Sequence, residues 1–318
     1  MRRRRFKEQE NTAYYHLMSR TVNGEAWFGG REREVLRKII WQVAEFSGVR
    51  VITYAVMKNH FHLFVEVPGE RSVSDEELVR RYRILYPRPT AWQPMSADVL
   101  AEHLASGSSE GRDLRKALLG RMHDISYLMK TLKQRFSIWF NGSRERFGPV
   151  WADRFKSVLV EGDRWALRTV AAYIDLNAVR AGLVKDPKDY RFCGYGEAVG
   201  GGRLARAGLS IVDSDLAGYR QTLYGTGAGA REEKVSLSRE EAVRVLMKEK
   251  GKLPLSVVLR CRVRYFTDGM VLGSPDFVNE RIQSEEGAEK RSRKAHAMLG
   301  SDWGGLAVGT GLRKALFR

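Results

Sequence analysis

The chain has 318 residues, 43% of them hydrophobic, and carries 55 lysines and arginines against 38 aspartates and glutamates, which gives a formal net charge of +17. This balance favours a polyanionic partner, and nucleic acid is the first candidate. No apolar run approaches the roughly 20 residues that a membrane-spanning helix needs, and the basic start over 1–6 is not followed by the apolar stretch of a secretory signal, so we expect a cytoplasmic, nucleoid-associated protein with no membrane partner.

The first two thirds of the chain alternate strand and helix patterns. Apolar residues recur at helical spacing over 31–46, and Gly48 predicts the end of that helix. The run 49–67 breaks at Lys58 and Asn59 into two strands that suit a hairpin. The full set of predicted elements is strands over 13–20, 49–57, 59–67 and 155–160 and helices over 31–46, 125–140 and 163–180. This order is typical of an α+β protein with a ferredoxin-like antiparallel sheet and helices on one face.

Two histidines in the second strand of the hairpin are the most informative feature of the sequence. His60 and His62 flank Phe61. Because successive side chains of a strand point to opposite faces, both imidazoles project from one face while Phe61 turns into the core. One metal ion could therefore bind both. From this strand alone, two structural histidines without a metal remain the alternative.

A second group of polar residues lies on the helix predicted after the fourth strand, for which Asp163 is the N-cap. Tyr173, Asn177 and Arg180 fall at i, i+4 and i+7, so a phenol, an amide and a guanidinium share one side of the helix. A tyrosine oxygen can attack a phosphodiester when a metal neutralises the phosphate, and an asparagine carbonyl could complete the metal's oxygen ligands. The alternative is that Tyr173 is an ordinary packing residue.

Four sequence blocks carry a resemblance to a known family. They are YHLMSR over 15–20, MKNHFHL over 57–63, WADRFKS over 151–157, and YIDLNAVRAGLV over 173–184 followed by DYR over 189–191. In this order they resemble the single-tyrosine HUH transposases, the IS200-like family, and most of all the REP-associated tyrosine transposases. The resemblance covers residues 10 to 197, with an insertion at about 70–126.

The resemblance implies a site and a reaction. His60 and His62 would hold a divalent ion, Mg²⁺ or Mn²⁺, and Asn177 would complete its ligands. Tyr173 would attack single-stranded or hairpin DNA, which leaves a 5′-phosphotyrosine on the protein and a free 3′-hydroxyl. Relatives act as monomers or as homodimers with shared sites, and the sequence leaves both open. One departure from the family is Ala178, where relatives commonly have proline.

Several further residues are candidates for contacts with DNA. Arg20, Arg154 and Lys156 lie beside the motif blocks and could bind phosphates, as could Arg180 on the tyrosine helix. His16, on the first strand, could contact DNA, support the metal ligands from behind, or be purely structural. Four aromatic residues interleaved with arginines could stack on unpaired bases or simply pack in the core: Trp139, Phe140, Phe147 and Trp151.

The rest of the chain carries weaker signals. Residues 198–235 are glycine-rich and predict a linker. Residues 236–318 predict a helical C-terminal region, with helices at 242–247, 255–265 and 274–282, that could bind DNA, mediate dimerisation or be purely structural. Two other functions fit the same residues. One is a DNA-binding regulator at palindromic repeats without turnover, and the other is a metal-dependent phosphodiesterase that uses water in place of Tyr173.

Overall fold

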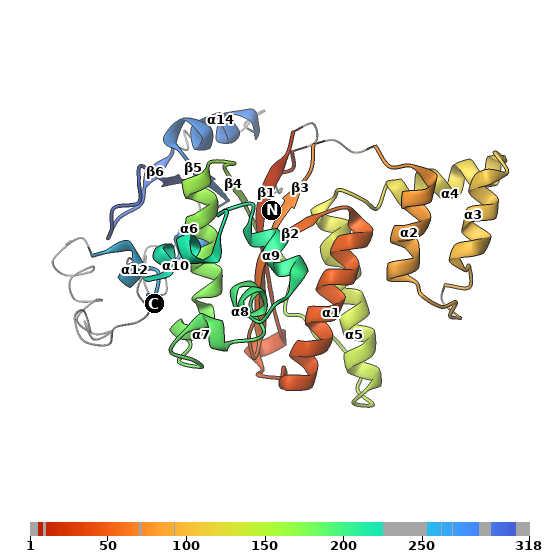
Figure 1. The fold of residues 1–318 in the computed structure, drawn as a ribbon, viewed down its shortest axis with the longest axis horizontal. Helices are drawn as coiled ribbons and strands as arrows, with labels where there is room; N and C mark the ends of the chain where they lie inside the picture. Colours follow the sequence, from red (N-terminus) through yellow and green to blue (C-terminus); the bar gives the residue numbers. More distant parts are fainter. Residues whose placement is uncertain are drawn as a thin grey trace.

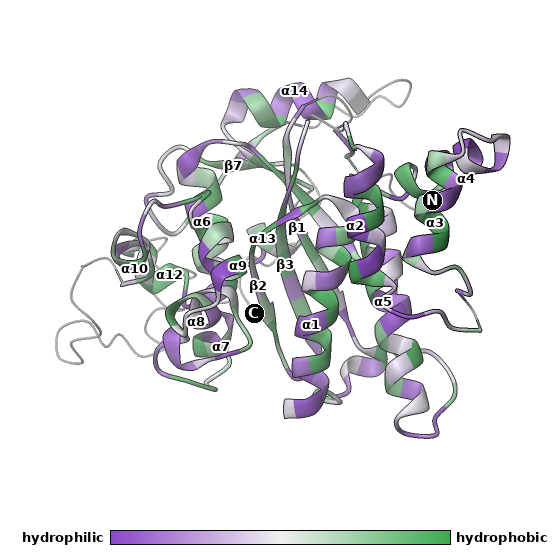
Figure 2. Cartoon of the chain, turned by 45° about the vertical axis from the view of Figure 1, so that its right-hand side comes forward, coloured by the Kyte–Doolittle hydropathy of each residue, from purple (hydrophilic) through white to green (hydrophobic). Residues whose placement is uncertain are grey.

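A seven-stranded sheet runs through the computed structural model, which describes residues 6–8, 11–69, 72–91, 93–224, 253–261, 263–268, 270–285 and 294–309 (Figure 1). The strand order is β2-β3-β1-β4-β5-β7-β6. Figure 2 shows hydrophobic residues concentrated on the central strands, while α1 (Gly30–Ser47) alternates hydrophobic and hydrophilic residues along its length. In this described part of the chain, no helix is both long and apolar enough to cross a lipid bilayer.

The first four strands form the ferredoxin-like core that the sequence predicted. They are β1 (Ala13–Arg20), β2 (Arg50–Val56), β3 (His60–Val67) and β4 (Lys156–Val160). All three neighbouring pairs are antiparallel, and β1 lies between β3 and β4. The hairpin turns at Lys58 and Asn59 as expected, since Met57 donates its N–H to the carbonyl of His60 at 2.8 Å.

Helices cover both faces of this core. On one face lie α1, which ends at Gly48 in the left-handed conformation (φ 63°), and α5 (Ile125–Gly142). Phe61 points to this face, where its ring lies 5.5 Å from that of Trp151, which in turn lies 5.5 Å from Phe136 of α5. The helix α6 (Arg164–Asp175) packs on the opposite face, against β2 and β3. The helices predicted over 31–46 and 125–140 therefore share one face, as expected, whereas the helix predicted from 163 lies on the other face as α6.

The insertion after β3 is helical and lies away from α6. It contains α2 (Asp75–Leu85), α3 (Ala97–Ala105) and α4 (Ser109–Leu119). A serine caps each helix, because the hydroxyls of Ser74, Ser96 and Ser108 accept the N–H of the residue three positions on. Since α2 packs on α1, the insertion extends the α1 side of the molecule (Figure 1) and does not displace the tyrosine helix.

The predicted linker is folded where the structure describes it. After α6 come α7 (Asn177–Arg180), α8 (Gly194–Val199), α9 (Arg203–Leu209) and α10 (Leu216–Tyr224), with short 3-10 turns at Val22–Gly24 and Pro187–Asp189. Within 198–224, Leu209 and Tyr219 are buried, as α9 packs on β2 and α10 on α6. The linker prediction for these residues was wrong, because apolar residues at helical spacing, such as Leu209 and Tyr219, pack α9 and α10 onto the core despite the neighbouring glycines.

The C-terminal region contributes strands as well as helices. Its elements are α12 (Leu255–Val258), α13 (Tyr265–Asp268), β5 (Val271–Gly273), α14 (Pro275–Glu285), β6 (His296–Ala297) and β7 (Ala307–Val308). The helix predicted over 274–282 corresponds to α14, the one over 255–265 is split into α12 and the start of α13, and the one over 242–247 lies outside the described residues. β5 pairs parallel to β4, so this region extends the core sheet.

Candidate active site

The two motif histidines share one face of β3, as their spacing predicted. Their ring centroids lie 5.2 Å apart. Phe61 between them is fully buried on the other face. The Nδ1 atom of His60 is hydrogen-bonded to Oδ1 of Asn59 at 2.7 Å, which orients the ring from the hairpin turn. The hairpin thus fixes both imidazoles on the face that α6 covers.

His16 supports His62 from the neighbouring strand. Its Nε2 lies 2.8 Å from Nδ1 of His62. His16 is completely buried, and this burial, with a smaller contribution from the charge of Arg180, lowers its pKa to about 3 although the backbone of Phe266 acts in the opposite direction. His16 is therefore neutral at physiological pH. It is buried in this arrangement, and whether it contacts DNA stays a prediction. Its hydrogen bond directs the Nε2 atom of His62, and not its Nδ1, toward any metal.

Tyr173 lies beside these histidines. The carboxylate of Asp163 caps α6 by accepting the N–H groups of Trp165 and Ala166, as predicted. The Tyr173 ring centroid lies 6.3 Å from that of His62 and 6.4 Å from that of His16. Two motifs more than 100 residues apart in sequence therefore meet in one chain. We call His16, His60, His62 and Tyr173 the histidine–tyrosine cluster.

The C-terminal region covers Tyr173. Only 3% of its surface is exposed. Its ring stacks on that of Phe266 with the centroids 4.3 Å apart, and its hydroxyl donates to the carbonyl of Val263 at 3.4 Å. DNA cannot reach the hydroxyl in this arrangement unless the segment that carries Val263 and Phe266 withdraws.

The residues that follow Tyr173 are close to the cluster, but not on one continuous helix. The helix is interrupted at Leu176 (φ −73°, ψ 0°), which separates α6 from α7. Asn177 is buried, and its Nδ2 has no hydrogen-bond partner among the residues that the structure describes. Arg180 donates to the carbonyls of Tyr173 and Leu259, each at 2.6 Å, and its guanidinium lies 3.9 Å from the Tyr173 ring centroid. Arg180 thus links the tyrosine to its cover.

The other predicted DNA contacts lie on the surface. Arg20 ends β1 opposite His60, Lys156 begins β4 opposite Met18, and Arg154 precedes β4. All three side chains that the sequence singled out are exposed: Arg20, Arg154 and Lys156. Nothing in the structure tests whether they bind phosphate, and this stays a prediction.

A buried carboxylate that the sequence analysis missed holds α6 in place. Asp175 accepts hydrogen bonds from the Thr53 hydroxyl at 2.8 Å, the Tyr195 N–H at 3.0 Å and the Tyr219 hydroxyl at 2.6 Å. Burial raises its pKa to about 6, although these hydrogen bonds act in the opposite direction. They join α6 to β2, α8 and α10. The sequence did contain a sign of this buried carboxylate, because Asp175 lies among apolar residues of the predicted helix, two positions after Tyr173.

The donors in the cluster suit a divalent metal in part. Within the described residues, no group of three or more histidine, cysteine, aspartate or glutamate side chains is placed to hold an ion. The two motif imidazoles nevertheless face the side of the sheet that α6 covers, and the buried amide of Asn177 begins α7, directly after α6. Since nitrogen and oxygen of an amide can exchange places by rotation, Asn177 could offer either atom. Water and phosphate oxygens would have to supply the remaining ligands.

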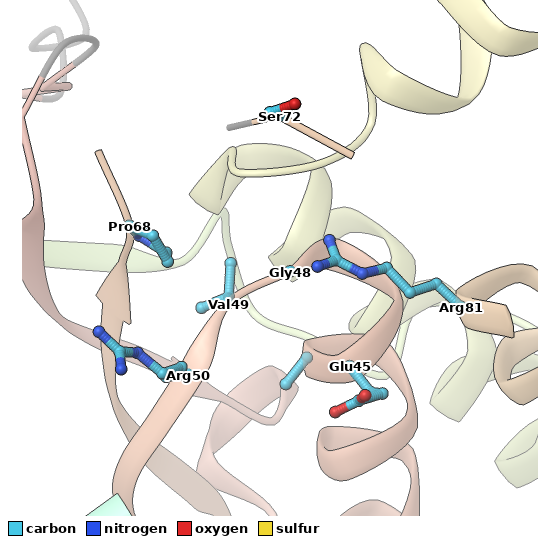
Figure 3. Close-up of a pocket in the computed structure, with 8 residues that line it drawn as sticks. Glu45, Gly48, Val49, Arg50, Pro68, Ser72 and Arg81 are labelled. Atoms are coloured by element: carbon cyan, nitrogen blue, oxygen red, sulfur yellow. The ribbon is translucent and has the colours of Figure 1, made fainter. Parts of the chain in front are cut away.

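A cavity of about 570 Å³ opens at the opposite end of β3 (Figure 3). Its two arginines are neutralised by acids, as Arg50 pairs with Glu66 and Arg81 pairs with Glu77. At about 3.3 Å per strand residue, Pro68 in its wall lies about 26 Å along the strand direction from His60. The cavity is therefore separate from the histidine–tyrosine cluster.

Comparisons with known proteins identify the segment that carries the histidines. Residues 9–84 match the family model described as "Transposase IS200 like". A comparison with curated proteins finds no match. A solved structure described as a REP-associated tyrosine transposase bound to a REP hairpin has 16% identity and a TM-score of 0.40, over 64% of this chain and 87% of that one. The family match therefore covers residues 9–84, which carry both motif histidines, and it agrees with the family that the sequence blocks resemble.

Proposed function

We propose that the protein is a nickase and strand transferase for single-stranded DNA, with Tyr173 as nucleophile. The observation that carries this proposal is the 6.3 Å separation of the Tyr173 and His62 ring centroids within one chain. Packing alone does not require a tyrosine beside the motif histidines, whereas attack by a phenolic oxygen on a metal-bound phosphate does. Because both groups come from the same chain, we also propose that one subunit supplies a complete site.

In the proposed reaction the phenolic oxygen of Tyr173 attacks the phosphorus of a phosphodiester. The new O–P bond replaces the bond to the 3′-oxygen, the phenolic proton passes to solvent, and the departing 3′-oxygen takes a proton from solvent. The product is a 5′-phosphotyrosine and a free 3′-hydroxyl. The reverse attack by another 3′-hydroxyl would rejoin strands without an external energy source, since the bond energy is kept in the phosphotyrosine.

The residues around Tyr173 have separate parts in this proposal. Arg180 places a positive charge 3.9 Å from the ring centroid, where it would attract the phosphate. His60, His62 and Asn177 would hold a divalent ion, Mg²⁺ or Mn²⁺, with His16 orienting His62. When bound, such an ion neutralises non-bridging phosphate oxygens and so favours attack by an anionic nucleophile.

A labelled DNA hairpin with single-stranded flanks provides the test. After incubation with Mn²⁺, the wild-type protein should carry a covalent DNA adduct that survives denaturation. Tyr173→Phe should form none, while Tyr127→Phe, which alters a half-exposed tyrosine on α5, should react like the wild type. Cleavage that persists in Tyr173→Phe would favour the phosphodiesterase and contradict the proposal.

One observation favours a second function, that of a DNA-binding regulator. The Tyr173 hydroxyl is buried and hydrogen-bonded to the Val263 carbonyl, so it is inaccessible in this arrangement. A protein that always keeps this arrangement would bind repeat palindromes without cutting them. Hairpin binding with no adduct, over a range of Mn²⁺ concentrations and with every flank sequence tried, would support the regulator.

A further inference from the structure

The loop between α5 and β4 has a fixed shape at its tip. We call residues 143–149 the tip loop. Asn141 organises it: its side-chain amide donates to the Gly148 carbonyl at 3.0 Å, and its Oδ1 and backbone carbonyl accept from Arg146 at 3.1 and 2.9 Å. Arg146 also donates to the Pro149 carbonyl at 3.2 Å. These bonds hold two positive-φ residues, Glu145 (φ 47°) and Gly148 (φ 95°), in a tight turn.

The tip loop is also fastened to the body of the protein. Arg144 donates to Glu32 of α1 at 2.9 Å, and its guanidinium lies 4.8 Å from the Phe140 ring centroid. The guanidinium of Arg146 lies 4.2 Å from the ring centroid of Trp27. Both arginines that flank the tip are therefore held by specific partners, and the loop is ordered before any ligand arrives.

This ordered loop holds one aromatic side chain in solvent. Phe147 is 93% exposed, more than any other large hydrophobic side chain in the described ranges. Of the other aromatic residues that the sequence suggested as base platforms, Phe140 is buried, and Trp139 and Trp151 are half-buried against the ring of Phe136. Covering this phenylalanine with the flat face of a partner would be favourable, because it would remove apolar surface from water.

The tip loop leads directly into the histidine end of the sheet. Val22 donates its N–H to the carbonyl of Val150 at 3.0 Å, and Thr21 donates to the carbonyl of Asn59 at 2.9 Å. Val150 and Asn59 thus lie on either side of the segment that carries Thr21 and Val22, each about one strand spacing of 4.8 Å away, so about two spacings separate them. Phe147, three residues before Val150, adds at most about 10 Å to this distance. The exposed ring therefore lies within a few nucleotides' reach of His60.

We propose that Phe147 is a stacking platform for an unpaired base of the DNA strand that enters the histidine–tyrosine cluster. This inference rests on the proposed function and names the part of the substrate that the site would hold. Stacking on an aromatic ring combined with a cationic surface is how proteins bind single strands. The exposed cations Arg20, Arg154 and Lys156 lie at the same end of the sheet. Because every base has an aromatic face, the platform adds affinity without fixing the sequence.

The test measures binding separately from cleavage. Fluorescence anisotropy compares a hairpin that carries single-stranded flanks of about ten nucleotides with the same hairpin without flanks. We expect Phe147→Ala to weaken binding of the flanked hairpin by about 5- to 100-fold and to leave the blunt hairpin unaffected. Phe147→Trp should retain binding. Leu204→Ala, which truncates a 54% exposed leucine on α9, is the matched control.

An abasic scan of the flank locates the base that stacks. At one position, removing the base should weaken binding by the wild type and erase the difference between wild type and Phe147→Ala. Equal binding by both proteins would overturn the inference, as would an equal loss on the blunt hairpin. A change in sedimentation of the DNA-free protein with unaltered DNA binding would also overturn it and assign Phe147 to a contact between subunits.

The two proposals can fail independently. If the wild type forms the Tyr173 adduct but Phe147→Ala binds the flank normally, only the stacking platform is refuted. If no adduct forms and Phe147→Ala still weakens flank binding, the nickase proposal fails and the platform stands as part of a DNA-binding protein.

Discussion

Replacing Tyr219 by phenylalanine would test how the tyrosine helix is positioned. The change removes one oxygen, which donates to Oδ2 of Asp175 at 2.6 Å in a fully buried site. A hydrogen bond to a charged group contributes about 1.5–3 kcal/mol, and its buried partner would be left short of a donor. We expect Tyr219→Phe to lower the free energy of unfolding by about 2 kcal/mol at pH 8.

The size of this loss should depend on pH in a defined direction. Asp175 has a pKa of about 6 in the folded protein against an ordinary value of 3.8. Between these values the folded protein holds a proton that the unfolded chain has lost, so wild-type stability falls as pH rises and levels off above about 6. Without the Tyr219 hydroxyl the folded-state pKa rises further, and the fall continues to higher pH. At pH 4.5, where Asp175 is protonated in the folded protein, we expect a loss of only about 1 kcal/mol.

Urea unfolding followed by tryptophan fluorescence, at pH 4.5 and pH 8, measures both losses. Tyr195→Phe is the control, because its hydroxyl accepts from Arg220 at 3.2 Å and is not bonded to Asp175. Its loss should be smaller and should not grow between the two pH values. A Tyr219→Phe deficit that is equal at both pH values, or that stays below about 0.5 kcal/mol at pH 8, would refute the assignment of a charge-assisted bond.

Three further predictions concern the histidine–tyrosine cluster. His16→Leu removes the partner of His62 Nδ1 and should weaken Mn²⁺ binding by about 10- to 100-fold, which calorimetric titration of the DNA-free protein measures; unchanged affinity would argue against a supporting role. Phe266→Leu keeps an apolar side chain but loses the stacked ring, so nitration of Tyr173, quantified by mass spectrometry, should become faster than in the wild type. Arg180→Lys replaces a planar fork, whose two nitrogens each bond one carbonyl, by a single nitrogen, and should lower stability by about 1 kcal/mol while also speeding nitration. A protected Tyr173 in both variants would show that neither residue holds the cover.

The parts of the site that local pattern determines could be predicted from the sequence. The i, i+2 spacing places His60 and His62 on one face of β3 because alternation is a property of any strand. Asp163 and Gly48 mark helix ends through capping and left-handed geometry, and both are found in those roles. The approach of Tyr173 to these histidines depends on tertiary packing, and only the family resemblance indicated it in advance.

The remaining features depend on residues distant in sequence. Nothing near Tyr173 predicts that Val263 and Phe266 will cover it, since 90 residues separate the hydroxyl from its acceptor. β5 and β7 have three and two residues, too few to show alternation. The break at Leu176 was also missed, because the apolar pattern continues across it while only the backbone dihedral angles change.

The residues that cover Tyr173 lie about 90 positions after it in the sequence, so they are synthesised later. At about 5–20 residues per second, a ribosome needs roughly 5–20 seconds to make the 90 residues between Tyr173 and Val263. During that interval a nascent chain that has already folded through α7 would expose its tyrosine. The order of synthesis would therefore decide when the Tyr173 hydroxyl is accessible.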